Sequence, residues 1–246
     1  MRRFIMGAVY AIALICAFGM CSQANAARYK LTLINTDEHP LPSVIGTLWI
    51  DKLGSYQRVY AGPIWLNVLD TQTNQSEVVR MLCVDLAAEI SVNQTWEADI
   101  SYARPSTVAS DSAWDKAVWM AVNNSGWYSP SGWPTGDPAT QDAAVQLSVW
   151  EVIADGSTNF SMESGSFNVS PNPFEGANRE EVLQIAQGYF NSANPPQGYG
   201  SSYAWYDATS SGQDLLFIPT VPEIPAVALG SIGLSLLACW RSRRRK

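Results

Sequence analysis

The sequence predicts an α+β fold, in which an antiparallel β-sandwich or barrel-like core carries inserted helices. Two observations lead to this prediction. Short segments rich in β-branched and aromatic residues, bounded by turn residues, recur over 29–100. Apolar residues spaced three or four apart follow over 112–190, and two more strand-like segments come after them, at 203–206 and 215–218. The helices are therefore expected between the early and the late strands.

Five early strands are expected, and one hairpin among them matters most. Residues 64–69 and 78–84 are expected to pair across a polar turn, which places Cys83 near the end of a central strand. A Gly62-Pro63 break interrupts the strand segment that precedes the turn. The expected early strands are 29–34, 44–50, 57–69, 77–84 and 95–100.

Three helices are expected, each with its own start signal. Asp111 is expected to cap the first, and Asp137 followed by Pro138 starts the second. Asn178 and Glu181 form a capping-box-like start for the third. The expected helices cover 112–123, 138–155 and 178–190.

The two ends of the chain differ from its middle. The N-terminal end has a basic start, an apolar run and an A-x-A site before Ala27, as in a secretory signal. Residues 224–240 have no charged side chain and precede a basic tail, which is typical of a membrane helix with a cytoplasmic C-terminus. We therefore expect a signal peptide at 1–26, an exported domain at 27–220 and a membrane end at 221–246.

The exported domain is acidic and contains one cysteine. It has 8 basic and 21 acidic residues, a net charge of −13, which argues against nucleic acid or anionic lipid as a partner. Cys16 and Cys21 leave with the signal and Cys239 lies in the membrane end, so Cys83 has no disulfide partner. It is either an inert buried thiol or a group with its own chemistry.

The second expected helix places a polar side chain on its apolar face. At about 100° per residue, Gln146 points the same way as Trp150, whereas Ser148 and Glu151 form the opposite, polar face. Burying a carboxamide without a partner costs about 2–7 kcal/mol. We therefore expect Gln146 to be paired, with Cys83 as its partner.

Most other chemistry is excluded or weakly indicated. His39 is the only histidine, so a metal site built on several histidines is excluded, and no phosphate-binding glycine motif occurs. A nucleophilic pair of His39 and Cys83 would lack an orienting third group. Trp127 and Trp133 lie in a Gly/Pro-rich loop, where they either stack on sugars or cover the helices. We expect no metal and no cofactor.

Cys83 and Gln146 together indicate a covalent bond. A Cys83 thiolate held against the Gln146 carboxamide would attack its carbon and expel ammonia, because well-oriented groups reach effective molarities of about 10⁵–10⁸ M. The product is an internal thioester, which an amine would open to give an amide at Gln146 and a free thiol. Each molecule reacts once, so we do not expect an enzyme.

Two short segments resemble motifs of bacterial surface thioester domains. Residues 81–86 (Met-Leu-Cys-Val-Asp-Leu) resemble the cysteine motif, and residues 145–150 (Val-Gln-Leu-Ser-Val-Trp) resemble the motif Thr-Gln-x-Ala-Ile-Trp. The resemblance implies that Cys83 and Gln146 form the thioester and that Trp150 packs beside it. Val145 and Ser148 stand where that family has threonine and alanine, so the supporting threonine hydroxyl is missing.

The C-terminal end resembles the PEP-CTERM sorting signal of Gram-negative bacteria. Val221-Pro222-Glu223-Ile224-Pro225 precedes the apolar segment and the arginine cluster, with one residue inserted in the Pro-Glu-Pro motif. The resemblance implies recognition by exosortase, with an inner-membrane-anchored precursor that reaches the cell surface or extracellular matrix. The alternative is an ordinary membrane anchor.

The expected function is covalent attachment of an exported cell-surface protein to amine or hydroxyl groups on a partner or matrix. The competing expectation is a structural protein of the extracellular matrix or biofilm with no reactive bond. A hydrolase or transferase that depends on Cys83 is a third class.

Overall fold

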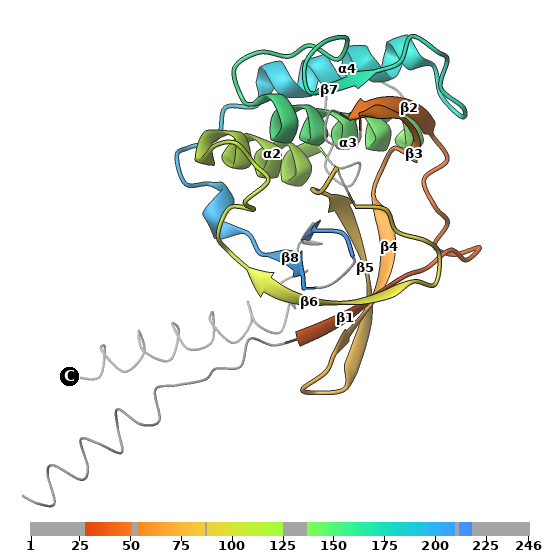
Figure 1. Cartoon of the computed structure of the whole chain (residues 1–246), viewed down its shortest axis with the longest axis vertical. Helices are drawn as coiled ribbons and strands as arrows, with labels where there is room; N and C mark the ends of the chain where they lie inside the picture. Colours follow the sequence, from red (N-terminus) through yellow and green to blue (C-terminus); the bar gives the residue numbers. More distant parts are fainter. Residues whose placement is uncertain (1–27, 51–53, 87, 125–136, 210–211, 218–246) are drawn as a thin grey trace, which may run out of the picture.

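The computed structural model describes residues 28–50, 54–86, 88–124, 137–209 and 212–217. They form an α+β fold with a closed six-stranded antiparallel barrel, a three-stranded sheet and three α-helices (Figure 1). The expected α+β class and the barrel-like core with inserted helices are confirmed. The elements are β1 (Arg28–Leu33), β2 (Ile45–Ile50), β3 (Ser55–Tyr60), β4 (Ile64–Asp70), β5 (Gln75–Cys83), β6 (Thr95–Ser101), α2 (Asp111–Asn124), α3 (Pro138–Asp155), β7 (Phe167–Val169), α4 (Arg179–Ser192), the 3₁₀ helix η2 (Gly200–Ser202), β8 (Trp205–Ala208) and β9 (Leu215–Phe217).

The barrel closes in the order β1-β4-β5-β9-β8-β6, so the late strands complete a sheet that the early strands begin. The expected hairpin is confirmed, because β4 and β5 pair from Asp70↔Gln75 to Ile64↔Met81. On its other side β5 pairs with β9, where Cys83 lies opposite Leu215. Cys83, at the end of β5, is therefore paired with a strand from the C-terminal part of the domain.

The segment expected as one strand, 57–69, is two strands in different sheets. β3 pairs with β2 in the three-stranded sheet, whereas β4 pairs with β1 and β5 in the barrel. Gly62 between them has φ +144°, and a Cβ there would lie 3.1 Å from Pro42. Gly62 therefore supplies a backbone conformation and a close approach that other residues rarely allow, and the chain changes sheets at this point.

Helix α3 is buried on every side from Ala143 to Ile153, which corrects the expected polar face. It lies between α2 and α4 (Figure 1). The Ser148 hydroxyl donates to the carbonyls of Ala144 and, on α4, Ala186, at 2.6 and 3.2 Å. The Glu151 carboxylate accepts from the Ser161 amide at 2.7 Å. Both side chains are buried because α4 and the segment after α3 cover the face that periodicity alone assigns to solvent.

The expected caps hold at two of three helices. The Asp137 carboxylate accepts from two amides of the first turn of α3, and Asn178 does the same for α4. At α2 the expectation was wrong by one residue. Asp111 is the first residue of the helix, and the hydroxyl of Ser110 accepts from the Ala113 amide at 3.2 Å.

Within the described ranges, no helix combines the length and the apolar character needed to cross a membrane. The expected signal peptide, membrane helix and sorting motif lie outside the described residues. The sorting motif comprises Val221, Pro222, Glu223 and Pro225.

Candidate functional site

Cys83 and Gln146 lie in contact at the junction of the barrel and the helices. The Cys83 amide donates to Oε1 of Gln146 at 3.2 Å, and Nε2 of Gln146 donates to the Cys83 carbonyl at 2.9 Å. Gln146 is 0 % exposed and Cys83 is buried. The carboxamide is therefore clamped against the main chain of the cysteine by two hydrogen bonds.

The end of the β4–β5 ladder explains this contact. The last pair is Ile64↔Met81, and Cys83 lies two residues further along β5. The opposite chain turns away at Gly62 and Pro63, so none of the described strands faces Cys83 on that side. A carboxamide has the same donor and acceptor as a peptide group and takes the place of the missing strand. Without it, two buried main-chain groups would be unpaired.

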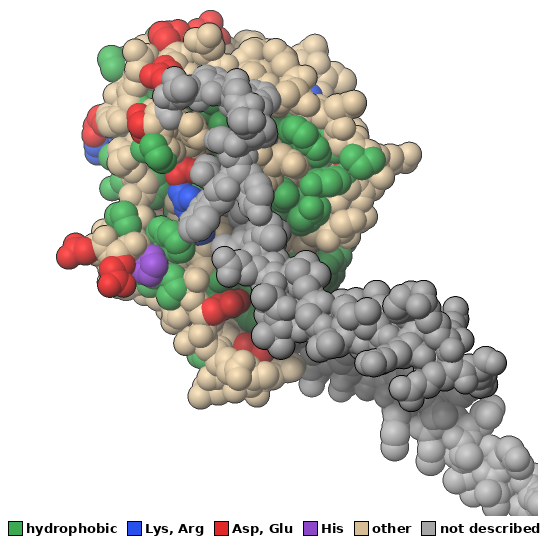
Figure 2. Space-filling view, turned by 180° about the vertical axis from the view of Figure 1, so that it is seen from behind, with side chains coloured by type: hydrophobic (Ala, Val, Ile, Leu, Met, Phe, Trp, Pro, Cys, Tyr) green, Lys and Arg blue, Asp and Glu red, His purple; other side chains and the backbone are tan. Residues whose placement is uncertain are grey.

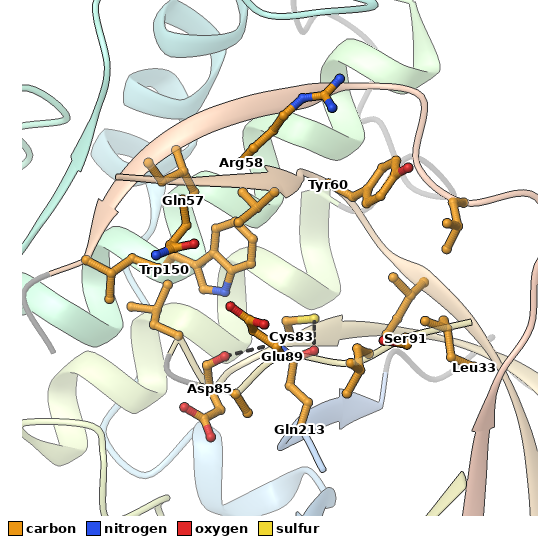
Figure 3. A pocket seen from close by; sticks show the side chains of 18 of the residues that line it. Leu33, Gln57, Arg58, Tyr60, Cys83, Asp85, Glu89, Ser91, Trp150 and Gln213 are labelled. Atoms are coloured by element: carbon orange, nitrogen blue, oxygen red, sulfur yellow. Dashed lines mark hydrogen bonds between the residues drawn. The ribbon is translucent and has the colours of Figure 1, made fainter. Parts of the chain in front are cut away.

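The thiol has a partner that the sequence analysis missed. Sγ of Cys83 donates to Oε1 of Gln213 at 3.0 Å, and Nε2 of Gln213 donates to the carbonyl of Asp85 at 2.9 Å (Figure 3). Gln213 lies two residues before the short strand-like segment at 215–218, and nothing in its sequence context indicates burial. It reaches Cys83 only because β9 pairs with β5.

The environment of Cys83 keeps its thiol neutral. Burial, and secondarily the charge of Asp85, raise the pKa of Cys83 far above its ordinary value. This corrects the expectation of a thiolate, because at neutral pH the sulfur carries its proton. Any reaction at Sγ must therefore move that proton as well as the electron pair.

A pocket of about 490 Å³ lies over Cys83. Its walls come from β2, β3 and the segment that follows β5, and Trp150 and Gln213 also line it (Figure 3). A small nucleophile in this pocket would be next to the thiol. About half of the lining residues are aliphatic, and the charged ones are Arg58, Asp85 and Glu89.

The predicted supporting residues differ in where they lie. Trp150 lines the pocket with Cys83 and packs on Phe167 at 6.2 Å between ring centroids. Its indole nitrogen is buried and has no hydrogen-bond partner among the described residues. Val145 is buried and Ser148 is bonded to α4, and neither lines the pocket. The structure thus brings Trp150 to the cysteine, and not Val145 or Ser148.

The alternative nucleophile pair is not brought together. His39 packs against Trp65 at 4.5 Å between ring centroids and does not line the pocket over Cys83. The outer face that carries His39 shows several acidic and few basic side chains (Figure 2). In the part of the chain that the structure describes, no cluster of three or more metal-ligating side chains occurs. Trp127 and Trp133 lie outside the described residues.

Comparison of the chain with known protein families, with curated proteins and with solved structures finds no significant match.

Proposed function

We propose that this protein forms an internal thioester between Sγ of Cys83 and Cδ of Gln146. The observation that carries the proposal is the fully buried carboxamide of Gln146 held against the main chain of Cys83, which is the one free cysteine among the described residues. The sulfur adds to Cδ, the C–N bond breaks, and the thiol proton leaves with the nitrogen as ammonia. Fixing the two groups in place makes this displacement feasible.

The main chain of Cys83 supports the same reaction. Oε1 of Gln146 gains negative charge when sulfur adds to the carbonyl carbon, and the Cys83 amide already donates to that oxygen at 3.2 Å. A preorganised donor of this kind stabilises the tetrahedral intermediate. The full burial of Gln146 also limits the access of bulk water to its carbonyl carbon.

The bond serves for covalent capture. An amine or hydroxyl group on a partner or matrix approaches through the pocket over Cys83, whose lining includes Cys83 but not Gln146. It attacks Cδ of Gln146 from the Cys83 side and breaks the C–S bond. The partner is then joined to Gln146 by an amide or ester, and the proton from the attacking group restores the Cys83 thiol. Because the bond is used once, the protein is a covalent adhesin and not a catalyst.

Delivery to the surface is proposed from the two ends of the chain. Residues 1–26 direct export, and the signal at 221–246, with Val221, Pro222, Glu223 and Pro225 in its motif, is recognised by exosortase at the inner membrane. The precursor is membrane-anchored, and the mature domain reaches the cell surface or the extracellular matrix. Support for this step comes from the resemblance of the sequence alone.

A structural matrix protein without the bond is the second candidate. One observation favours it: the two hydrogen bonds to Cys83 already satisfy both polar atoms of the Gln146 carboxamide. The pair would then be a core contact that stabilises the end of β5 and nothing more.

Intact mass and thiol titration of the purified full-length chain separate the two candidates. The mass of wild type should be lower than the mass expected from its sequence by one ammonia, whereas Cys83→Ser should have the mass expected from its sequence. Wild type should also have one titratable thiol fewer than its number of cysteines. Methylamine should add one amine at Gln146 and expose the Cys83 thiol, whereas the Cys83→Ser variant should not react. A full thiol count and an unshifted mass in wild type would leave the structural candidate.

A further inference from the structure

A main-chain carbonyl orients the side-chain amide of Gln213 toward the thiol of Cys83. It is 6 % exposed, and its Nε2 donates to the Asp85 carbonyl at 2.9 Å. Only the NH₂ end of a carboxamide can face a carbonyl, so the oxygen end faces Sγ of Cys83 at 3.0 Å. The Asp85 carbonyl therefore determines which end of the Gln213 amide the sulfur meets.

The turn that carries Gln213 is also fixed on both sides. A Cβ on Gly212 would lie 2.1 Å from the ring of Trp96, so the chain passes directly against that indole. The carbonyl of Asp214 accepts from the Val84 amide at 3.0 Å, and its carboxylate accepts from the Ala208 amide at 2.9 Å. Residues 212–214 are thus held against β6, β8 and the residue that follows β5, which keeps Oε1 of Gln213 close to the sulfur.

An amide oxygen at this place suits a thiol and does not suit a thioester. A thiol donates its S–H to the oxygen, whereas a thioester sulfur has no proton and presents lone pairs to it. Closing the thioester would leave the buried Oε1 of Gln213 without its donor, and an unpaired buried acceptor is unfavourable. Opening it restores the hydrogen bond.

We propose that Gln213 is a positioning residue that stabilises the thiol form of Cys83, so that it speeds opening of the thioester and keeps the captured state open. The inference rests on the proposed function. During capture, the attacking amine forms the N–C bond to Cδ of Gln146, and the C–S bond breaks. The proton that the nitrogen loses ends on Sγ, and the resulting S–H donates a hydrogen bond to Oε1 of Gln213.

The test compares Gln213→Leu with wild type in the full-length chain. Gln57→Leu is the matched control, since Gln57 lines the same pocket but its amide donates to Ser55. Methylamine should release the Cys83 thiol about tenfold more slowly in Gln213→Leu, a change of about 1.4 kcal/mol in the barrier, and the closed fraction before treatment should be higher. Equal rates and closed fractions in Gln213→Leu and wild type would overturn the proposal.

A spectroscopic signature separates positioning from a general loss of structure. The infrared S–H stretching band of Cys83, identified as the band that Cys83→Ala removes, should lie at lower frequency in amine-opened wild type than in amine-opened Gln213→Leu. The Gln146→Ala variant, which cannot close, allows the same comparison with and without Gln213→Leu. If wild type contains no thioester, the proposed function fails. If the S–H band of Gln146→Ala is then the same with and without Gln213→Leu, the hydrogen bond from Cys83 to Gln213 is overturned as well.

Discussion

Gln146 and Glu151 are both buried polar residues of α3, but their partners differ. Gln146 uses both ends of its carboxamide on the main chain of Cys83. Glu151 accepts the Ser161 amide with Oε1, while its other oxygen has no partner among the described residues. Gln146 does not titrate, whereas ionisation of Glu151 is unfavourable in the folded protein because its carboxylate is buried.

Removing the Gln146 carboxamide should destabilise the fold even where no thioester can form. In a Cys83→Ala background the two main-chain hydrogen bonds persist, and Gln146→Ala should lower the free energy of unfolding by about 2–5 kcal/mol, because two buried groups lose their partners. Urea denaturation measures the difference. Gln187→Ala, which removes a hydrogen bond on the outer side of α4, should change stability far less.

Glu151 should make stability fall as pH rises. Burial, opposed by the Ser161 hydrogen bond and aided by the charge of Asp155, raises the pKa of Glu151 from 4.5 to about 7. Between these values the folded protein keeps a proton that the unfolded chain releases, so the free energy of unfolding decreases with pH by up to about 3 kcal/mol and levels off above about pH 7.

Glu151→Gln isolates this effect from that of Asp214, whose pKa burial raises to about 6. The glutamine oxygen can still accept the Ser161 amide. The free energy of unfolding, measured by denaturation, should decrease less between pH 5 and pH 8 in Glu151→Gln than in wild type. The exposed control Glu38→Gln should show the same decrease as wild type. An identical loss in Glu151→Gln would exclude Glu151 as the titrating group.

At the scale of elements, β5 and α3 must be held together for Cys83 to meet Gln146. Arg80 of β5 forms an ion pair with Asp142 of α3, and both side chains are less than one fifth exposed. The guanidinium also lies 5.8 Å from the centroid of the Trp65 ring on β4. This ion pair fixes the helix against the strand one turn before Gln146.

Asp142→Asn tests the link between the two elements. It leaves the charge of Arg80 in a partly buried place, so the free energy of unfolding should drop by about 1–3 kcal/mol, and the closed fraction of the thioester should drop with it. Glu175→Gln breaks the Arg58–Glu175 pair, whose side chains are 63 % and 62 % exposed, and should cost less than about 1 kcal/mol. Equal losses in the two variants would argue against a role of the Arg80–Asp142 pair in placing α3.

At the scale of the whole molecule, the thioester would act as a covalent cross-link between barrel and helices. It would join Cys83 of β5 to Gln146 of α3 and would close a loop that contains β6, α2 and part of α3. Such a closure restricts the unfolded chain, as a disulfide does.

Opening the thioester should therefore lower thermal stability. The loop from Cys83 to Gln146 has about 64 residues, and the chain-entropy relation for a loop of this size amounts to about 4 kcal/mol. At about 2–4 °C per kcal/mol, methylamine should lower the Tm by roughly 8–16 °C. Differential scanning fluorimetry measures the shift, and the Tm of Cys83→Ala should not respond to methylamine.

Local sequence determined the elements of this protein. All three helices and most strands lie within a few residues of their expected bounds, because apolar periodicity and caps such as Asp137 act over a few positions. The same periodicity placed Gln146 toward the core. It was wrong where it assigned Ser148 and Glu151 to solvent, since only the docking of α4 and the next segment buries that side.

Only the tertiary structure decided what surrounds the thiol. Cys83 contacts Gln146, which lies 63 positions away in the sequence, and Gln213, which lies 130 positions away. Such contacts depend on where the β4–β5 ladder ends and on the pairing of β9 with β5. The sequence by itself determined that a lone cysteine and a core-facing glutamine exist, because those are properties of single residues and one helix. The end of the β4–β5 ladder decided that the glutamine pairs with the cysteine main chain, and the pairing of β9 with β5 decided that a second amide contacts the sulfur.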